Sequence, residues 1–286
     1  MRLPAVSRLA LAATFAFPAA LSAQFASSSY AATELFENAM VTQHAFTMAK
    51  NAAGYWVGDG GGSGGARLFH YDLTGAFTAS YAPGLDFRSI FSDASGNVFA
   101  RNYADPTIYK MGAPGVFASY VTLAGGSLNA QSNVVLDAGG TRYIAMSGGT
   151  VSTWDASGTF LGSTSLIGFS GIEAFYPQSR GIVSVGGKWL TYNGLGDLSE
   201  WDPATGARLG TTTLLGAGVS FDGQFSLSYT GGKVWVADGS GPEYYWRGYD
   251  VGLSDVAAVP EPASITLIGI GLAGLGLVAR KRQIAA

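Results

Sequence analysis

Cysteine is absent from the 286-residue chain, and only two histidines, His44 and His70, are present. Disulfide bonds, a thiol nucleophile, a zinc–thiolate site and a three-histidine metal site are therefore excluded. Charge is also scarce, because Asp, Glu, Lys and Arg make up 12% of the residues. The formal net charge is −3, and five of the 16 basic residues lie within ten residues of an end. This balance argues against a nucleic-acid partner.

The N-terminus has the order of a secretory signal. Arg2 and Arg8 precede the apolar run from Leu9 to Leu21, and small residues follow up to Ala23. A basic segment, a short apolar segment and small residues at the cleavage site are typical of a signal peptide. We expect residues 1–23 to be removed after Ala23, with Ala31 as the second choice. An uncleaved anchor is the alternative, but the apolar run is short for a membrane span.

The C-terminus contains a second apolar run, residues 263–279, which has no charge. As a helix it would be about 25 Å long, near the lower limit for crossing a bilayer. Pro262 suits the first turn of such a helix. The bases that follow the run stay on the cytoplasmic side by the positive-inside rule, which leaves the large N-terminal part outside. The sequence therefore predicts a transmembrane helix over 263–279.

The last 28 residues resemble the PEP-CTERM sorting signal of Gram-negative bacteria. The resemblance rests on a tripeptide, a Gly- and Leu-rich span and a basic cluster in that order: Pro260, Glu261, Pro262, residues 263–279, Arg280, Lys281 and Arg282. It implies that the tripeptide is recognised by an exosortase, a membrane-embedded transpeptidase-like enzyme, and that the basic cluster stops transfer. It also implies transient anchoring in the inner membrane and removal of the tail on delivery to the surface or extracellular matrix. The sequence departs mildly in extending to Ala286, and a permanent anchor is the alternative.

Five segments of the exported part, residues 24–258, read as hairpins. Each has a short apolar strand, a Gly-containing turn and a second strand rich in aromatic or β-branched residues. Four hairpins are followed by an aromatic–Asp pair and then Gly, at Asp72, Asp155, Asp202 and Asp250, and another β-rich run follows most of them. The turn glycines recur at intervals of 42, 44, 41 and 51 residues: Gly54, Gly96, Gly140, Gly181 and Gly232.

A period in the forties with four strands per unit is typical of a β-propeller. We therefore predict an all-β protein with about five four-stranded blades, and residues near Glu34 to Val41 supply the last outer strand by ring closure. A β-sandwich or an irregular β-solenoid would show similar strands. The repeats resemble those of NHL-like and quinoprotein-like propellers, which also pair a hairpin with an aromatic–Asp turn. This resemblance implies an architecture and no activity.

No cofactor is expected, and the metal candidates are few. Asp59, Asp238 and Glu243 lie in Gly-rich loops at equivalent places of the first and fifth repeats, which are neighbours in a closed ring. Their oxygen atoms would suit calcium. No D-x-D-x-D-G series is present, and turns that happen to contain Asp explain the same residues. The recurring aromatic–Asp motifs have a structural explanation as well, because Asp caps such turns and Gly supplies positive φ.

Aromatic residues gather near the expected ring closure, at Tyr244, Tyr245 and Trp246. Their faces would suit stacking of sugars, and they suit packing between blades equally. No convincing catalytic group is found, since His70 lies in an expected strand.

The sequence thus predicts a non-enzymatic, exported propeller at the cell surface or in the matrix, with exopolysaccharide as a possible partner. An extracellular sugar lyase, lactonase or hydrolase and a membrane-anchored scaffold for another protein are the alternatives.

Overall fold

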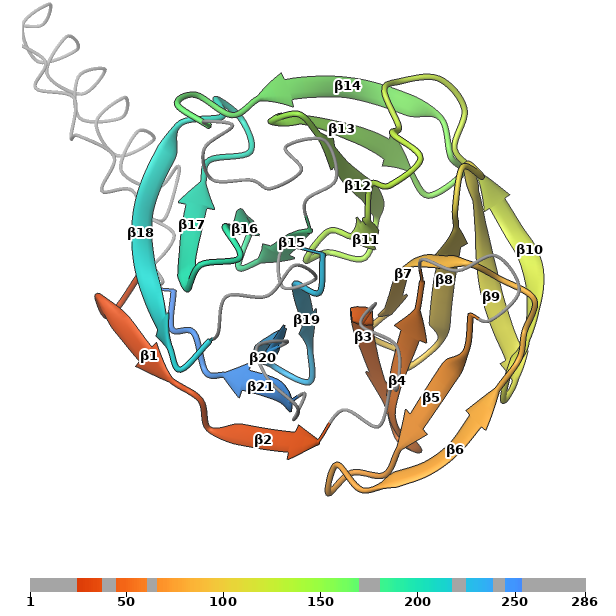
Figure 1. Cartoon of the computed structure of the whole chain (residues 1–286). Coiled ribbons are helices and arrows are strands. Elements are labelled where there is room, and N and C mark those ends of the chain that lie inside the picture. The colour runs from red at the N-terminus through yellow and green to blue at the C-terminus, as the bar shows by residue number, and fades with distance from the viewer. Residues whose placement is uncertain are drawn as a thin grey trace, which may run out of the picture. The chain divides into compact units, whose positions relative to one another are not determined.

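Five β-sheets are arranged around a central axis as the blades of a propeller in this computed structural model (Figure 1). The structure describes, within one unit of residues 23–255, residues 25–37, 45–60, 66–169, 181–217, 225–238 and 245–253. Every regular element in those ranges is a strand, which confirms the all-β prediction and the five blades. The expected signal peptide and transmembrane helix lie outside the described residues.

Blades 1 to 3 each consist of four consecutive antiparallel strands, ordered from the axis outwards. Blade 1 contains β3 (Ala45–Asn51), β4 (Gly54–Asp59), β5 (Leu68–Tyr71) and β6 (Phe77–Tyr81). Blade 2 contains β7 (Phe87–Ser92), β8 (Val98–Asn102), β9 (Thr107–Ala113) and β10 (Val116–Thr122). Blade 3 contains β11 (Val134–Leu136), β12 (Arg142–Ser147), β13 (Thr150–Asp155) and β14 (Phe160–Ser165).

Blades 4 and 5 are completed by the N-terminal arm, residues 25–37. Blade 4 contains β15 (Ile182–Val185), β16 (Lys188–Tyr192), β17 (Asp197–Trp201) and β18 (Arg208–Leu215), and β1 (Ser29–Ala31) pairs parallel with β18. Blade 5 contains β19 (Ser228–Thr230), β20 (Lys233–Asp238) and β21 (Tyr245–Tyr249), and β2 (Glu34–Glu37) is its outer strand. Ring closure by residues following Glu34 is therefore confirmed.

The fourth blade corrects the predicted repeat. Gly181 was expected at the tip of the fourth hairpin, with the apolar run after it as the second strand. That run is instead the innermost strand, β15, and the hairpin turns at Gly186 and Gly187. Both glycines have positive φ, as a two-residue type I′ turn requires.

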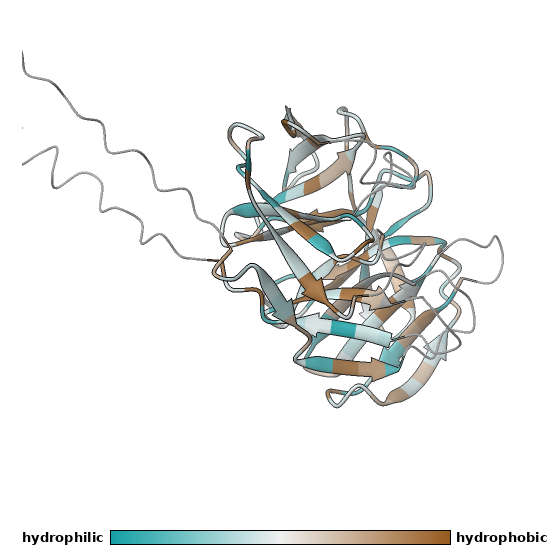
Figure 2. Ribbon diagram, turned by 60° about the vertical axis from the view of Figure 1, so that its left-hand side comes forward, coloured by the Kyte–Doolittle hydropathy of each residue, from teal (hydrophilic) through white to brown (hydrophobic). Residues whose placement is uncertain are grey.

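The core consists of apolar layers between adjacent blades rather than one central cluster. Figure 2 shows apolar and polar stretches alternating along the strands, as expected where sheets pack face to face. The largest layer joins blades 2, 3 and 4 and contains Trp154 and Trp201, and another joins blades 5 and 1 and contains Trp235 and Trp246. All four indoles are fully buried. The inner strands line the axis.

Hydroxyl groups join the inner strands of neighbouring blades. The Oγ atom of Ser228 in blade 5 accepts the N–H of Met48 in blade 1, at 2.7 Å. Thr47 of blade 1 accepts the N–H of Ile90 in blade 2 in the same way. Further links of this kind run from Lys50 N–H to Thr230, from Val134 N–H to Ser89 and from Ala138 N–H to Ser184. These N–H groups of the inner strands and turns are therefore satisfied by neighbouring blades.

Candidate functional site

A cavity of about 900 Å³ opens on the propeller axis at the end where the inner hairpins turn. We call it the axial cup. Figure 1 shows the five strands that form it, nearest the centre of the ring. All five blades contribute lining residues, from β3, β7, β11, β15, β19 and the turns that follow them. The site is therefore assembled from five segments far apart in the sequence.

The lower wall of the cup is largely apolar and buried. Met48, Ile90 and Val183 line it from three different blades, each about 1% exposed. Beyond them, towards the opposite end of the axis, the Nδ2 group of Asn133 in blade 3 donates to the carbonyl of Phe225 in blade 5. These two residues are buried and belong to blades that are not neighbours. Their contact therefore crosses the axis below the cup.

The rim of the cup differs between blades. In blades 1 to 3 the inner turn is capped by an Asn or Asp side chain. Asp93 Oδ1 accepts the N–H groups of Ser95 and Asn97, both at 2.9 Å. Asp137 Oδ1 accepts two backbone N–H groups in blade 3, and Asn51 caps the turn in blade 1. In blades 4 and 5 the turn is a bare Gly-Gly pair with positive φ.

Two further side chains shape the polar upper part of the cup. Tyr229, on the inner strand of blade 5, is 41% exposed and lines the cavity. Lys50 is the basic residue of the lining, and its Nζ group donates to the Tyr55 hydroxyl at 2.9 Å. That hydroxyl donates in turn to Glu34, and burial together with this bond raises the pKa of Tyr55. The Lys50 amine at the rim is therefore hydrogen-bonded to the group of residues that closes the ring.

The same contacts clasp the first and last blades. Glu34 receives the Tyr55 hydroxyl from blade 1 and lies 3.5 Å from Lys233 Nζ of blade 5. Lys233 also donates to Asp250 at 2.6 Å, an ion pair that lowers the pKa of Asp250. Asp250 therefore departs from the predicted turn motif, because its carboxylate serves ring closure.

The other three aromatic–Asp motifs are turn caps, in agreement with the structural interpretation. Asp155 Oδ1 accepts the N–H groups of Ser157 and Thr159, both at 2.9 Å. The Ser157 hydroxyl also donates to it, and these bonds lower the pKa of Asp155. Gly158 has a φ of +86° and its carbonyl accepts the N–H of Ala124 from blade 2, so this motif also joins two blades. Asp72 and Asp202 cap their turns similarly.

The described residues among those proposed from sequence for metal or sugar binding lie away from the cup. Asp59 is buried at the end of β4, opposite the mouth, and Asp238 ends β20 in the equivalent place of blade 5. Glu243 and Tyr244 lie outside the described residues. In the parts of the chain that the structure describes, no three His or acidic residues group as a metal site. Cup residues such as Tyr229 carried no motif in the sequence.

Trp246 corrects the stacking hypothesis. Its side chain is fully buried in the layer with Phe36, Tyr55 and Trp235, so it has no face for a ligand. Tyr245, the next residue along, is half-buried. The alternative, packing between blades, is the correct explanation of Trp246. His70 is likewise part of blade 1, where Nδ1 lies 2.6 Å from Thr78 Oγ1 and the ring stacks on Trp56.

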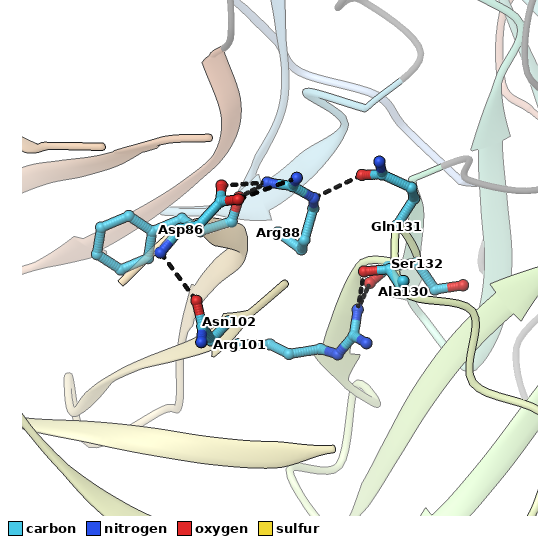
Figure 3. Close-up of polar contacts among 8 residues, drawn as sticks. Asp86, Arg88, Arg101, Asn102, Ala130, Gln131 and Ser132 are labelled. Carbon is cyan, nitrogen blue, oxygen red and sulfur yellow. Dashed lines mark hydrogen bonds and ion pairs between the residues drawn. The ribbon is translucent and has the colours of Figure 1, made fainter. Parts of the chain in front are cut away.

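A separate polar cluster between blades 2 and 3 was not anticipated. Figure 3 shows Arg88 pointing to Asp86 and Gln131, and Arg101 pointing to the carbonyls of Ala130 and Ser132. Arg101 is 1% exposed, and burial beside Arg88 lowers its pKa to about 10, so it stays charged at neutral pH. Loop carbonyls and side chains accept hydrogen bonds from the guanidinium groups of Arg88 and Arg101. The cluster therefore fixes a loop rather than offering a binding site.

Glu200, on β17, is a second unanticipated group. It is fully buried, and neither carboxylate oxygen has a hydrogen-bond partner among the described residues. Its neighbours across the sheet are Leu190 and Gly210. Burial raises its pKa to about 7, although Lys188 acts in the opposite direction. Glu200 does not line the cup.

The chain carries a PEP-CTERM protein-sorting motif, which matches residues 258–283. This motif includes the predicted recognition tripeptide and the basic cluster, Pro260, Glu261, Pro262, Arg280, Lys281 and Arg282. It implies export and processing by an exosortase, a membrane enzyme. No helix that could span a membrane occurs in the described ranges, and the expected span lies beyond them.

The fold has several solved counterparts at low sequence identity. A glutaminyl cyclase from Myxococcus xanthus is 11% identical with a TM-score of 0.49, over 80% of this chain and 99% of that one. A protein of unknown function from Bacteroides caccae is 14% identical with a TM-score of 0.41, over 65% and 81%. Streptogramin B lyase is 12% identical with a TM-score of 0.41, over 72% and 65%. No curated protein matches the sequence. Likeness at this level carries no information on activity.

Proposed function

We propose that this chain is an exported propeller that is displayed at the cell surface or in the exopolysaccharide matrix and acts there by binding, not by catalysis. The observation that carries the proposal is the position of the sorting motif, which begins five residues after the last described residue of the propeller, Leu253. The exported domain is thereby delivered as one unit, with the axial cup as its binding site.

Several contacts support binding over catalysis. The carboxylates of Asp93 and Asp137 cap turns, and the amine of Lys50 is tied to Tyr55. His70 lies in the body of blade 1, away from the cup. Asp93, Asp137 and Lys50 therefore have structural roles in the cup. A general acid or base needs instead a pKa that is tuned to proton transfer.

The N-terminal arm bears on the cleavage site. Cleavage after Ala23 would leave β1 and Phe25 in the mature protein, whereas cleavage after Ala31 would remove both. Phe25 forms a bridge with Leu253, and Tyr30 donates to the Gly252 carbonyl at 2.7 Å. These contacts support cleavage after Ala23, with Gln24 as the mature N-terminus.

Replacing Pro260, Glu261 and Pro262 together by Ala tests the proposal. We expect loss of the protein from the surface and matrix fractions and its accumulation in the membrane fraction of the native cells, measured by immunoblotting. The matched control replaces Ile284, which lies beyond the matched motif, by Ala and leaves the motif intact. Unchanged surface delivery of the first variant would refute sorting through this motif.

A further inference from the structure

We propose that the axial cup binds the uncharged end of a saccharide chain. This inference rests on the proposed function and specifies the ligand of the same site. It follows from four properties of the cup: the contact across the axis below it, its acceptors, its donor and its exposed aromatic ring.

A contact across the axis favours binding of a chain end over a chain that threads the ring. Asn133 and Phe225 are joined across the axis below the cup, and both are buried. The cavity of about 900 Å³ falls within the range of roughly 300–1,000 Å³ that is usual for sites that enclose a small ligand. A polymer that enters the cup would meet this contact, so we expect its terminal residues to be the ones that bind.

The rim offers acceptors for hydroxyl groups. In Asp93 and Asp137, Oδ1 is occupied by backbone N–H groups, whereas Oδ2 receives one side-chain donor, from Asn97 and Thr141 respectively. An ionised carboxylate oxygen has room for a further donor. The two residues cap equivalent turns of adjacent blades. Hydroxyl groups, which abound on a sugar, are suitable donors for both.

The cup also offers a donor and an aromatic surface. Ser184 accepts a backbone N–H, and its own hydroxyl hydrogen has no acceptor among the described residues. Tyr229 lines the cup and is 41% exposed, so its ring is accessible. A sugar ring has polar edges and an apolar C–H face, and an aromatic ring next to hydroxyl-binding groups suits both surfaces.

Other ligand classes fit less well. An anionic ligand would meet two carboxylates and one amine that is already bonded to Tyr55. An extended peptide would need free backbone groups on the inner strands, and the N–H groups of Met48, Ile90 and Val134 are already occupied by hydroxyls. The chemistry of the cup therefore favours an uncharged, hydroxyl-rich molecule.

The test uses the full chain in a zwitterionic detergent, which avoids sugar head groups. The probes are oligosaccharides released by partial acid hydrolysis of the exopolysaccharide of the same cells, separated into neutral and acidic fractions. We expect the neutral fraction to bind with one site per chain in titration calorimetry. Affinity should stop rising once an oligosaccharide exceeds about the length that the cavity can hold.

Matched variants locate the site. Tyr229→Ala and Asp93→Asn should each weaken binding at least tenfold, because one removes the ring and the other a charged acceptor. Tyr120→Ala, at an exposed ring on the outer strand of blade 2, and Asp155→Asn, in an outer turn with the same bonding, should leave it unchanged. Ala138→Trp, at an exposed position of the rim, should block the mouth without removing a bond and guards against misfolding of the first two.

Three outcomes would overturn the inference: no binding of the neutral fraction to folded protein, tighter binding of the acidic fraction, or neutral binding that Tyr229→Ala, Asp93→Asn and Ala138→Trp all leave intact. None of them would affect surface delivery, which the tripeptide variant measures separately. A failure of sorting and a failure of saccharide binding are therefore distinguishable.

Discussion

Blades 1 to 3 differ from blades 4 and 5 in how the inner turn is stabilised and in whether the N-terminal arm pairs with the outer edge. At the axis, the first three hairpins are capped by Asn or Asp side chains, whereas the last two rely on Gly-Gly turns. At the perimeter, no described strand lies beyond β6, β10 or β14, whereas β1 of the N-terminal arm pairs with β18 and β2 pairs with β21. The N-terminal arm thus adds strands to blades 4 and 5 only, and its Glu34 and Phe36 also contact blade 1. The capped side carries the acidic half of the cup.

The largest effect is expected where the arm enters the core. Phe36 of β2 is buried against Tyr55, Tyr71 and Trp235. Phe36→Ala should lower the free energy of unfolding by about 3–5 kcal/mol, because it removes a buried ring and leaves a cavity. Urea titration followed by circular dichroism measures the change. Leu35→Ala, at a half-exposed neighbour on the same strand, is the control and should change stability by less than about 0.5 kcal/mol. Equal effects would show that the arm is not anchored by Phe36.

The next effect concerns Glu200 in blade 4, the blade whose outer strand β18 pairs with β1. The pKa of Glu200 is raised from an ordinary 4.5 to about 7, so its folded form holds a proton that the unfolded chain releases. The contribution of Glu200 to stability should therefore be largest below pH 4.5, fall by roughly 3 kcal/mol up to pH 7 and level off above it. Glu200→Gln should remove this slope. Urea titrations of both proteins between pH 4 and 8 measure it, and a stability difference that does not vary with pH would contradict the buried, unpartnered carboxyl.

The smallest effect contrasts the two kinds of inner turn. Gly187→Ala places a β-carbon at a φ of +75° and should cost about 1–2 kcal/mol, although no atom crowds the site. Asp137→Ala removes the acceptor of two backbone N–H groups in blade 3 and should cost about 1 kcal/mol. Asn should restore most of the stability at both positions, because it tolerates positive φ at one and accepts N–H groups at the other. Thermal melts measure this, and Asn behaving like Ala would show that the turns do not depend on these features.

Much of the fold could be predicted because residues close together in the sequence signal each repeat. The inner turns at Gly54, Gly96 and Gly140 and the outer strands after the aromatic–Asp turns are signalled by neighbouring residues. The fourth blade was misassigned because Gly181 also follows a polar stretch next to an apolar run. Only packing on the adjacent inner strands decides between that glycine and the pair at Gly186 and Gly187.

The site could not be predicted in the same way. Its lining is a set of single residues from five hairpins, and each hairpin in isolation shows only an ordinary turn. Tyr229 resembles any strand tyrosine in the sequence, whereas the conspicuous cluster ending in Trp246 is core. Arg88 and Arg101 lie in otherwise apolar strands, which was the one available signal for the polar cluster between blades 2 and 3.

The pairing of β2 with β21 also sets an order of events. Phe36 of β2 pairs with Trp246 of β21. During export from the N-terminus, β2 crosses the membrane before the other strands of blade 5 and can pair only after β21 has crossed. Contacts that distant in sequence form late, because a long loop must close before they are rewarded. The ring can therefore close only when nearly the whole exported domain has emerged, at the moment when the sorting motif, which follows directly in the chain, reaches the membrane. The order of the chain therefore makes completion of the fold coincide with arrival of the sorting motif at the membrane.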